Sequence, residues 1–111
     1  MKKVFISGPY SSGDVVQNVK LAMDTASFLI DIGVAPFCHH LSYFIQVSRP
    51  QPYEKWMSIG LEFLDCCDVL LRLPGASSGA DREVEYAMTN LIPVVHSIEE
   101  LKQLLREELL R

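Results

Sequence analysis

The sequence predicts a single α/β domain in which helices cover a parallel sheet, and three observations support this. The chain has 111 residues, of which 49% are hydrophobic, so residues 1–111 can bury one core but not two. Short unbroken apolar runs, typical of strands buried on both faces, alternate with longer segments of helical periodicity. Each strand and helix pair has the length of a right-handed crossover between parallel strands.

The first strand and the first helix are predicted within residues 3–30. Residues 3–7 form a short apolar run that is ended by Gly8-Pro9, which indicates a buried strand. Asp14 is a suitable N-cap, and Gly33 is a suitable stop signal. Between them a helix over residues 14–30 is indicated by the spacing of Val15, Val19, Ala22, Ala26, Leu29 and Ile30.

The middle of the chain has a weaker pattern. Residues 34–38 predict a second short strand, in which Pro36 must sit where its missing N–H is not needed. Residues 39–52 carry aromatic residues and two prolines without a clear period, so we expect an irregular loop that covers a pocket. A helix over residues 53–66 is then indicated by Trp56, Met57, Ile59, Leu61, Phe63 and Leu64.

Two more strands and two more helices complete the pattern. Residues 68–73 and 92–95 predict strands, and the small-residue loop of residues 74–79 precedes a helix marked by Val84, Ala87, Met88 and Leu91. Ser97 and Glu100 match a capping box. It begins a last helix whose buried side carries Leu101, Leu104, Leu105 and Leu109. The sequence thus predicts a three-layer fold of the flavodoxin or Rossmann type, with four to five parallel strands and helices on both faces.

Charge and composition narrow the classes of partner. The formal net charge is −4 and no basic stripe is present, so polymeric nucleic acid is not an expected partner. The N-terminal apolar run is broken too early for a signal peptide or a membrane span, so no membrane association is expected. Cys38, Cys66 and Cys67 are an odd number without paired C-x-x-C spacing, which favours buried, reduced thiols and a cytoplasmic location.

Two loops follow strands and open helices, which is where parallel α/β folds bind small ligands. The first loop, residues 8–14, offers Gly8, Tyr10 and hydroxyl groups, and its backbone N–H groups could face an anion. It matches neither a G-x-G-x-x-G motif nor a Walker loop, and it lacks the phosphate-binding run of FMN proteins. The alternative interpretation is an ordinary turn capped by Asp14.

The second loop places Ser77, Ser78 and Gly79 at the start of a helix, with Glu83 soon after. The helix dipole favours an ionised carboxylate there, so Glu83 is expected to stay ionised and could attack the anomeric carbon of a sugar. Alternatively, these acidic residues only complement the dipole. Spacing alone does not distinguish Glu83 from Glu85, since each lies about 100° from Val84 around the helix.

Residues 68–87, together with residues 5–10, resemble the nucleoside 2-deoxyribosyltransferase-like superfamily. Its signature Ser-x-Gly-x-x-x-Glu-x-x-x-Ala is matched by Ser77, Gly79, Glu83 and Ala87. The resemblance implies an enzyme that cleaves or exchanges the N-glycosidic bond of a deoxynucleoside or its 5′-monophosphate, with Glu83 as the nucleophile and no cofactor. It also implies that Ser77 and residues 8–12 hold the substrate, and that a homodimer or larger homo-oligomer completes the pocket.

Two positions depart from this superfamily. Phe5 stands where many relatives have a tyrosine whose hydroxyl supports the nucleophile, and Gly60 stands where they commonly carry an aspartate near the nucleobase. Tyr10, Glu62 or Asp65 could replace that acid. These departures leave a rival interpretation open, a nucleotide-binding module on the same fold with lost or very slow catalysis.

Cys38, His39 and His40 are the three adjacent residues that, with His96 further along the chain, suggest a metal. Adjacent residues on a strand point to opposite faces, so these three cannot bind one ion without distortion, and no metal site is expected. The remaining aromatic residues of the middle region are expected in the core or in a lid, where one could stack on a nucleobase: Tyr43, Phe44, Tyr53 and Trp56.

Overall fold

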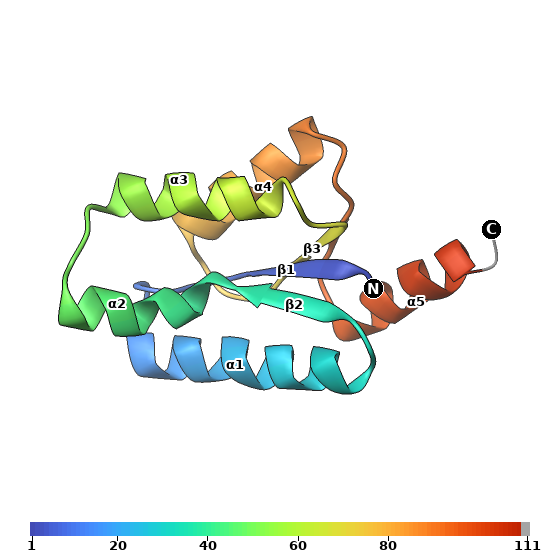
Figure 1. The fold of residues 1–111 in the computed structure, drawn as a ribbon, viewed down its shortest axis with the longest axis horizontal. Coiled ribbons are helices and arrows are strands. Elements are labelled where there is room, and N and C mark those ends of the chain that lie inside the picture. The colour runs from blue at the N-terminus through green and yellow to red at the C-terminus, as the bar shows by residue number, and fades with distance from the viewer. Residues whose placement is uncertain (110–111) are drawn as a thin grey trace.

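The computed structural model describes residues 1–109 and has the α/β architecture that the sequence predicts (Figure 1). Four parallel strands lie in the order β2-β1-β3-β4. The strands are β1 (Lys3–Ser7), β2 (Ala35–Cys38), β3 (Val69–Arg72) and β4 (Val94–Val95). The helices are α1 (Val15–Asp31), the 3₁₀ helix η1 (His39–Ser42), α2 (Tyr43–Ser48), α3 (Tyr53–Leu64), α4 (Ser78–Thr89) and α5 (Ile98–Leu109).

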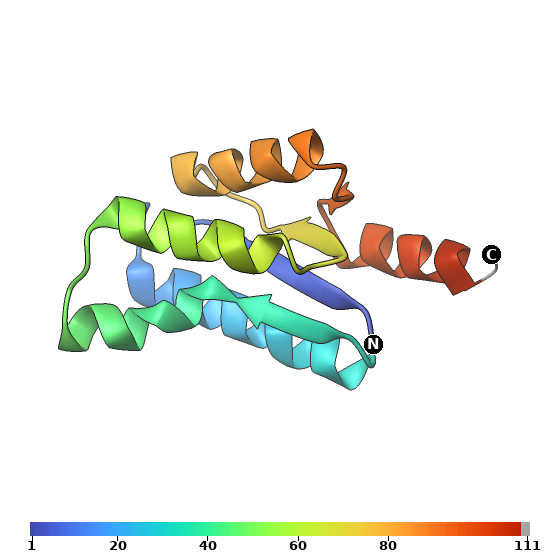
Figure 2. The ribbon, with the colours of Figure 1, turned by 45° about the horizontal axis from the view of Figure 1, so that its top comes forward.

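Helices cover both faces of the sheet and form three layers. Figure 2 shows α3 and α4 side by side on one face, while α1 lies on the other. On the α1 side, Val4 and Ile6 join a core that also contains residues of α1 and α5. On the opposite side, Phe5 packs with Leu64 of α3, Leu70 of β3 and Ala87 of α4. Side chains alternate along a strand, so Ser7, like Phe5, points toward α3 and α4.

The segment of residues 39–52 differs from its prediction as an irregular loop. It forms η1 and α2, and α2 buries none of its side chains in this chain. Four large apolar side chains of this segment are exposed, namely Leu41, Phe44, Ile45 and Val47. Because no single apolar stripe faces the core, the sequence shows no helical period here.

The other elements begin or end within a few residues of their predicted bounds. Pro36 lies in β2, an edge strand, where a missing N–H is tolerated. Asp14 caps α1 by accepting a hydrogen bond from the N–H of Gln17 at 3.2 Å. Leu101 is buried, and Leu104 and Leu105 pack against the same core. The side chain of Leu109 lies outside the described residues.

The cysteines only partly fit their prediction as buried thiols. Cys38 is buried, Cys67 is half-buried and Cys66 is exposed, because Cys66 follows the end of α3 where the chain turns at the surface. Within residues 1–109, no helix has the length and apolar composition that a membrane crossing requires.

Candidate active site

The loops that follow β1 and β3 pack closely against each other at the carboxyl edge of the sheet. A Cβ on Gly8 would lie 2.9 Å from Leu73 Cβ, which is closer than two such atoms approach. Gly75 has a φ of +114°, and a Cβ there would lie 2.8 Å from Pro9 Cγ. Both contacts require glycine, so the two glycines bring the candidate ligand-binding loops together.

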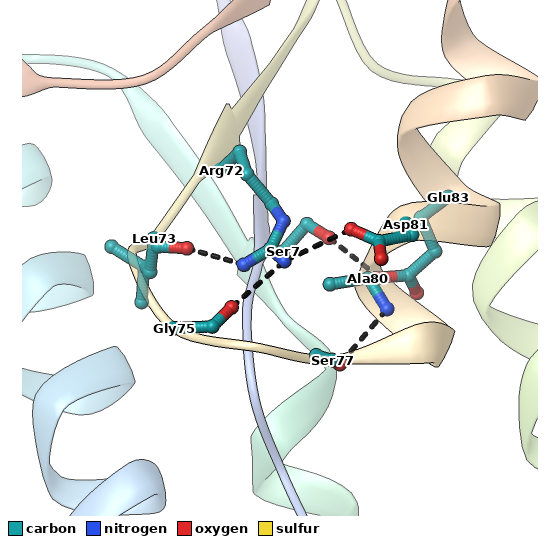
Figure 3. Close-up of polar contacts among 8 residues, drawn as sticks. All are labelled: Ser7, Arg72, Leu73, Gly75, Ser77, Ala80, Asp81 and Glu83. Carbon is teal, nitrogen blue, oxygen red and sulfur yellow. Dashed lines mark hydrogen bonds and ion pairs between the residues drawn. The ribbon is translucent and has the colours of Figure 1, made fainter. Parts of the chain in front are cut away.

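Arg72 holds the second loop in place (Figure 3). Its guanidinium donates hydrogen bonds to the carbonyl oxygens of Leu73 and, at 2.9 Å, of Gly75. It also contacts Asp81 Oδ1 in the first turn of α4 at 3.1 Å. One side chain from the end of β3 thereby links the loop to the helix that carries Glu83.

Ser77 has a local structural role at the start of α4. Its Oγ accepts a hydrogen bond from the N–H of Ala80 at 3.1 Å, which makes Ser77 the N-cap of the helix (Figure 3). A Cβ on Gly79 would lie 2.8 Å from the Tyr53 hydroxyl oxygen, so Gly79 allows Tyr53 of α3 to approach this helix end. Ser77, Ser78 and Gly79 all contribute to the wall of one cavity.

Glu83 is the acidic residue of α4 that points toward the sheet. It is 8% exposed, and its Oε1 accepts a hydrogen bond from Ser7 Oγ at 2.7 Å (Figure 3). Glu85, two residues further, is exposed. The structure therefore separates two carboxylates that spacing alone could not.

The expectation that Glu83 stays ionised is wrong. Burial raises the pKa of Glu83 from 4.5 to about 7, against the opposing effects of the Ser7 hydrogen bond and the positive charge of Arg72. Glu83 lies beyond the first turn of α4, where the helix dipole is weak. Removal from water therefore outweighs the dipole, and Glu83 exchanges its proton near neutral pH.

Glu83 contributes to a cavity of about 280 Å³, which is near the lower end of the roughly 300–1,000 Å³ typical of small-ligand sites. The cavity brings together all six site residues predicted from the sequence. Its wall includes residues of the first loop, of η1, of α3 and of α4, among them Gly8, Tyr10, Ser11, Ser12, His39, His40, Tyr53, Trp56, Met57, Ser77, Ser78, Gly79 and Glu83.

His39 and His40 also contribute to the cavity wall, although the sequence did not predict them there. They were expected to point to opposite faces of a strand, but the strand ends at Cys38 and a 3₁₀ helix begins at His39, so both contribute to the same wall. His40 Nε2 donates a hydrogen bond to the Pro9 carbonyl at 2.9 Å. Burial lowers the pKa of both imidazoles below the ordinary value. Among the described residues, no three His, Cys, Asp or Glu side chains are grouped to bind one metal ion.

The two departures from the superfamily pattern have different structural consequences. Phe5 is fully buried and stacks on Phe37, with ring centroids 5.4 Å apart. A hydroxyl nevertheless reaches Glu83, because Ser7 lies on the same side of β1 as Phe5. Sequence reasoning missed Ser7, although side-chain alternation along the strand could have identified it.

Gly60 lies beside Glu83. A Cβ on Gly60 would be 3.3 Å from Glu83 Oε2 and 2.8 Å from His39 Nδ1, so an aspartate could not be added there without displacing His39. The suggested replacements Glu62 and Asp65 do not contribute to the cavity wall, and Asp65 instead accepts a hydrogen bond from the Tyr86 hydroxyl at 2.6 Å. Tyr10 does contribute to the wall.

Fold and site together define a parallel α/β domain with a buried glutamate at the carboxyl edge of its sheet. Residues 2–97 match a family described as a domain of unknown function, DUF7768, and the chain belongs to this family. The matched range includes Glu83 and both loops of the site. No curated protein matches the chain.

Proposed function

We propose that this protein cleaves or exchanges the N-glycosidic bond of a deoxynucleoside or its 5′-monophosphate, with Glu83 as the nucleophile. The observation that carries the proposal is the position of Glu83, buried at the wall of a ligand-sized cavity with a hydroxyl donor on one oxygen. The resemblance to nucleoside 2-deoxyribosyltransferase-like proteins supplies the reaction type, because it aligns the nucleophile of those proteins with Glu83.

The reaction proceeds in two displacements. An oxygen of ionised Glu83 bonds to the anomeric carbon while the bond from that carbon to the base nitrogen breaks, giving a covalent glycosyl-enzyme. Water, or a second base in an exchange, then attacks the same carbon and releases Glu83. Ser7 holds Oε1, which leaves Oε2 as the attacking oxygen. No cofactor or metal ion takes part.

The rest of the cavity wall supplies groups that suit such a substrate. The N-terminus of α4 with Ser78 and Gly79, together with Ser11 and Ser12, offers hydrogen-bond donors for a phosphate or for sugar hydroxyls. Tyr53 and Trp56 offer aromatic surfaces for a base. The protein works as a cytoplasmic homodimer or larger homo-oligomer in this proposal.

A second candidate is a nucleotide-binding module on the same fold with lost or very slow turnover. It is favoured by Gly60, which provides no carboxylate beside Glu83, and by the burial that keeps much of Glu83 protonated at neutral pH. Binding of nucleotides without release of base is the result that this candidate predicts.

Base release from a panel of deoxynucleosides and deoxynucleoside 5′-monophosphates, followed by chromatography, tests the proposal. We expect release by the wild type and none by Glu83→Gln, because an amide does not form the glycosyl ester. Glu85→Gln is the matched control, and it should retain wild-type turnover because Glu85 is exposed. Turnover by Glu83→Gln would contradict the assignment.

A further inference from the structure

An imidazole and a carboxylate face one small space beside α3. A Cβ on Gly60 would lie 2.8 Å from His39 Nδ1 and 3.3 Å from Glu83 Oε2, so both atoms lie within 3.3 Å of one point. Gly60 has no side chain to fill that point. His39 comes from η1 and Glu83 from α4, and both contribute to the cavity wall.

The His39 ring is oriented by aromatic neighbours. Its centroid lies 6.0 Å from that of Phe37 and 5.8 Å from that of Trp56, the latter edge to face. His39 Nε2 is buried and has no hydrogen-bond partner among residues 1–109. A buried polar atom without a partner is unusual in a folded protein, and at a cavity wall a bound ligand or water is one way to complete its hydrogen bonding.

We propose that His39 is the general acid and general base of the reaction, which is an inference that rests on the function proposed for Glu83. In the first displacement the Glu83 oxygen bonds to the anomeric carbon, the carbon–nitrogen bond breaks, and the leaving nitrogen takes a proton from His39. In the second, a water oxygen bonds to that carbon, the bond to Glu83 breaks, and the proton from water passes to His39. The net reaction adds water across the N-glycosidic bond and restores both side chains.

The spacing of the two groups fits this role. In glycosidases that form a covalent intermediate, the nucleophile and the acid lie roughly 5–5.5 Å apart. His39 Nδ1 and Glu83 Oε2 lie 2.8 Å and 3.3 Å from one point, so they are no more than about 6 Å apart, a range that includes this separation. Burial lowers the pKa of His39 and raises that of Glu83 to about 7, so the reactive form, with Glu83 ionised and the proton on His39, is the less populated arrangement of that proton.

Other titratable groups on the cavity wall fit the role less well. His40 Nε2 is occupied by the Pro9 carbonyl at 2.9 Å; its Nδ1 is buried without a partner like His39 Nε2, but His39 is the imidazole that lies with Glu83 beside Gly60. Burial raises the pKa of Tyr10 above its ordinary value of 10.0, which makes its hydroxyl a weaker acid. His39 therefore provides the acid that Gly60 does not, from a different segment of the chain.

Single-turnover measurements with two His39 variants test the inference. His39→Phe keeps an aromatic ring between Phe37 and Trp56 but removes both nitrogens, and His39→Asn keeps a polar group of smaller size. With protein in excess, we expect the release of a natural purine base to slow by roughly two to four powers of ten. Release of p-nitrophenolate from a 2-deoxyriboside 5-phosphate should change little, because this leaving group needs no proton.

His96→Phe is the matched control, since His96 is exposed, and it should keep both wild-type rates. Equal slowing of both substrates in a folded His39 variant, or no slowing of purine release, would overturn the role of His39. Both outcomes would leave the role of Glu83 intact, since Glu83→Gln tests that separately. A wild type that releases no base would overturn the proposed function, and the role of His39 with it.

Discussion

Glu83 and Ser7 are a buried pair of side chains, in which the Ser7 hydroxyl donates a hydrogen bond to the Glu83 carboxylate. Hydrogen bonding to Ser7 favours the ionised form of Glu83, while burial favours the neutral form and has the larger effect. A carboxyl group that titrates near neutral pH can exist both as a nucleophile and as a neutral acid during one cycle.

The pKa of Glu83 makes the stability of the protein depend on pH. The folded state binds this proton up to a pH of about 7, whereas the unfolded chain releases it near 4.5. The contribution of Glu83 to the free energy of unfolding should therefore fall by about 3 kcal/mol as pH rises from 4.5 to 7 and then level off, while the lowered pKa values of His39 and His40 act in the opposite direction.

Glu83→Gln removes this dependence. Near pH 5 it should match the wild type, and at pH 8 it should be the more stable of the two, because the buried charge is gone. Urea denaturation of both proteins at pH 5, 6, 7 and 8 measures the difference, with Glu85→Gln expected to follow the wild type. A difference that stays constant with pH would show that Glu83 titrates at its ordinary pKa.

At the scale of elements, the site depends on how the β3–α4 loop is held. The Arg72 side chain is only 11% exposed, and it donates hydrogen bonds to Leu73, Gly75 and Asp81. Arg72→Met keeps the aliphatic stem but removes these hydrogen bonds, and it should lower the free energy of unfolding by about 1–3 kcal/mol. Base release should slow as well, because the start of α4 shifts.

Thermal denaturation and base release measure these effects. Arg82→Met is the matched control, since the ion pair of Arg82 with Glu54 is exposed and should contribute little. Equal stability of the Arg72 variant and the wild type would contradict the bracing role of Arg72.

The sequence predicted the elements whose apolar residues face a core and missed those whose apolar residues do not. The helical spacing of apolar residues is visible in the sequence of α1 and α4 because one stripe of each helix packs on the sheet. Helix α2 has no buried residue, and its sequence shows no such period. The cavity residues were predicted where they follow strands, as with Gly8 and Ser77. His39 was missed, because its place on the wall depends on where β2 ends.

The pKa of Glu83 also could not be predicted from its position on a helix. Helix position suggested an ionised group, but the burial that raises the pKa arises from packing of α4 against β1, which are far apart in the chain. The choice between Glu83 and Glu85 likewise needed either the resemblance or the fold.

At the scale of the whole molecule, the η1 and α2 segment beside the cavity exposes several large apolar side chains. These are Leu41, Phe44, Ile45 and Val47. Exposed apolar side chains favour association, and a small domain gains burial by forming a homodimer. We expect light scattering to give the mass of a dimer or larger assembly, and Ile45→Glu to give a folded monomer. A wild-type monomer at micromolar concentration would contradict this prediction.

The central claim is that Glu83 becomes covalently bound to the sugar. The test uses a 2′-fluoro-arabinosyl analogue of the nucleoside or nucleotide whose base the wild type releases. Fluorine destabilises the positive charge that develops on the sugar, and the analogue should slow the second displacement more than the first, so that the covalent intermediate accumulates. Mass spectrometry of the digested protein should then find the sugar on the peptide that contains Glu83. Release of the base with no adduct, or with an adduct on another residue, would contradict the account.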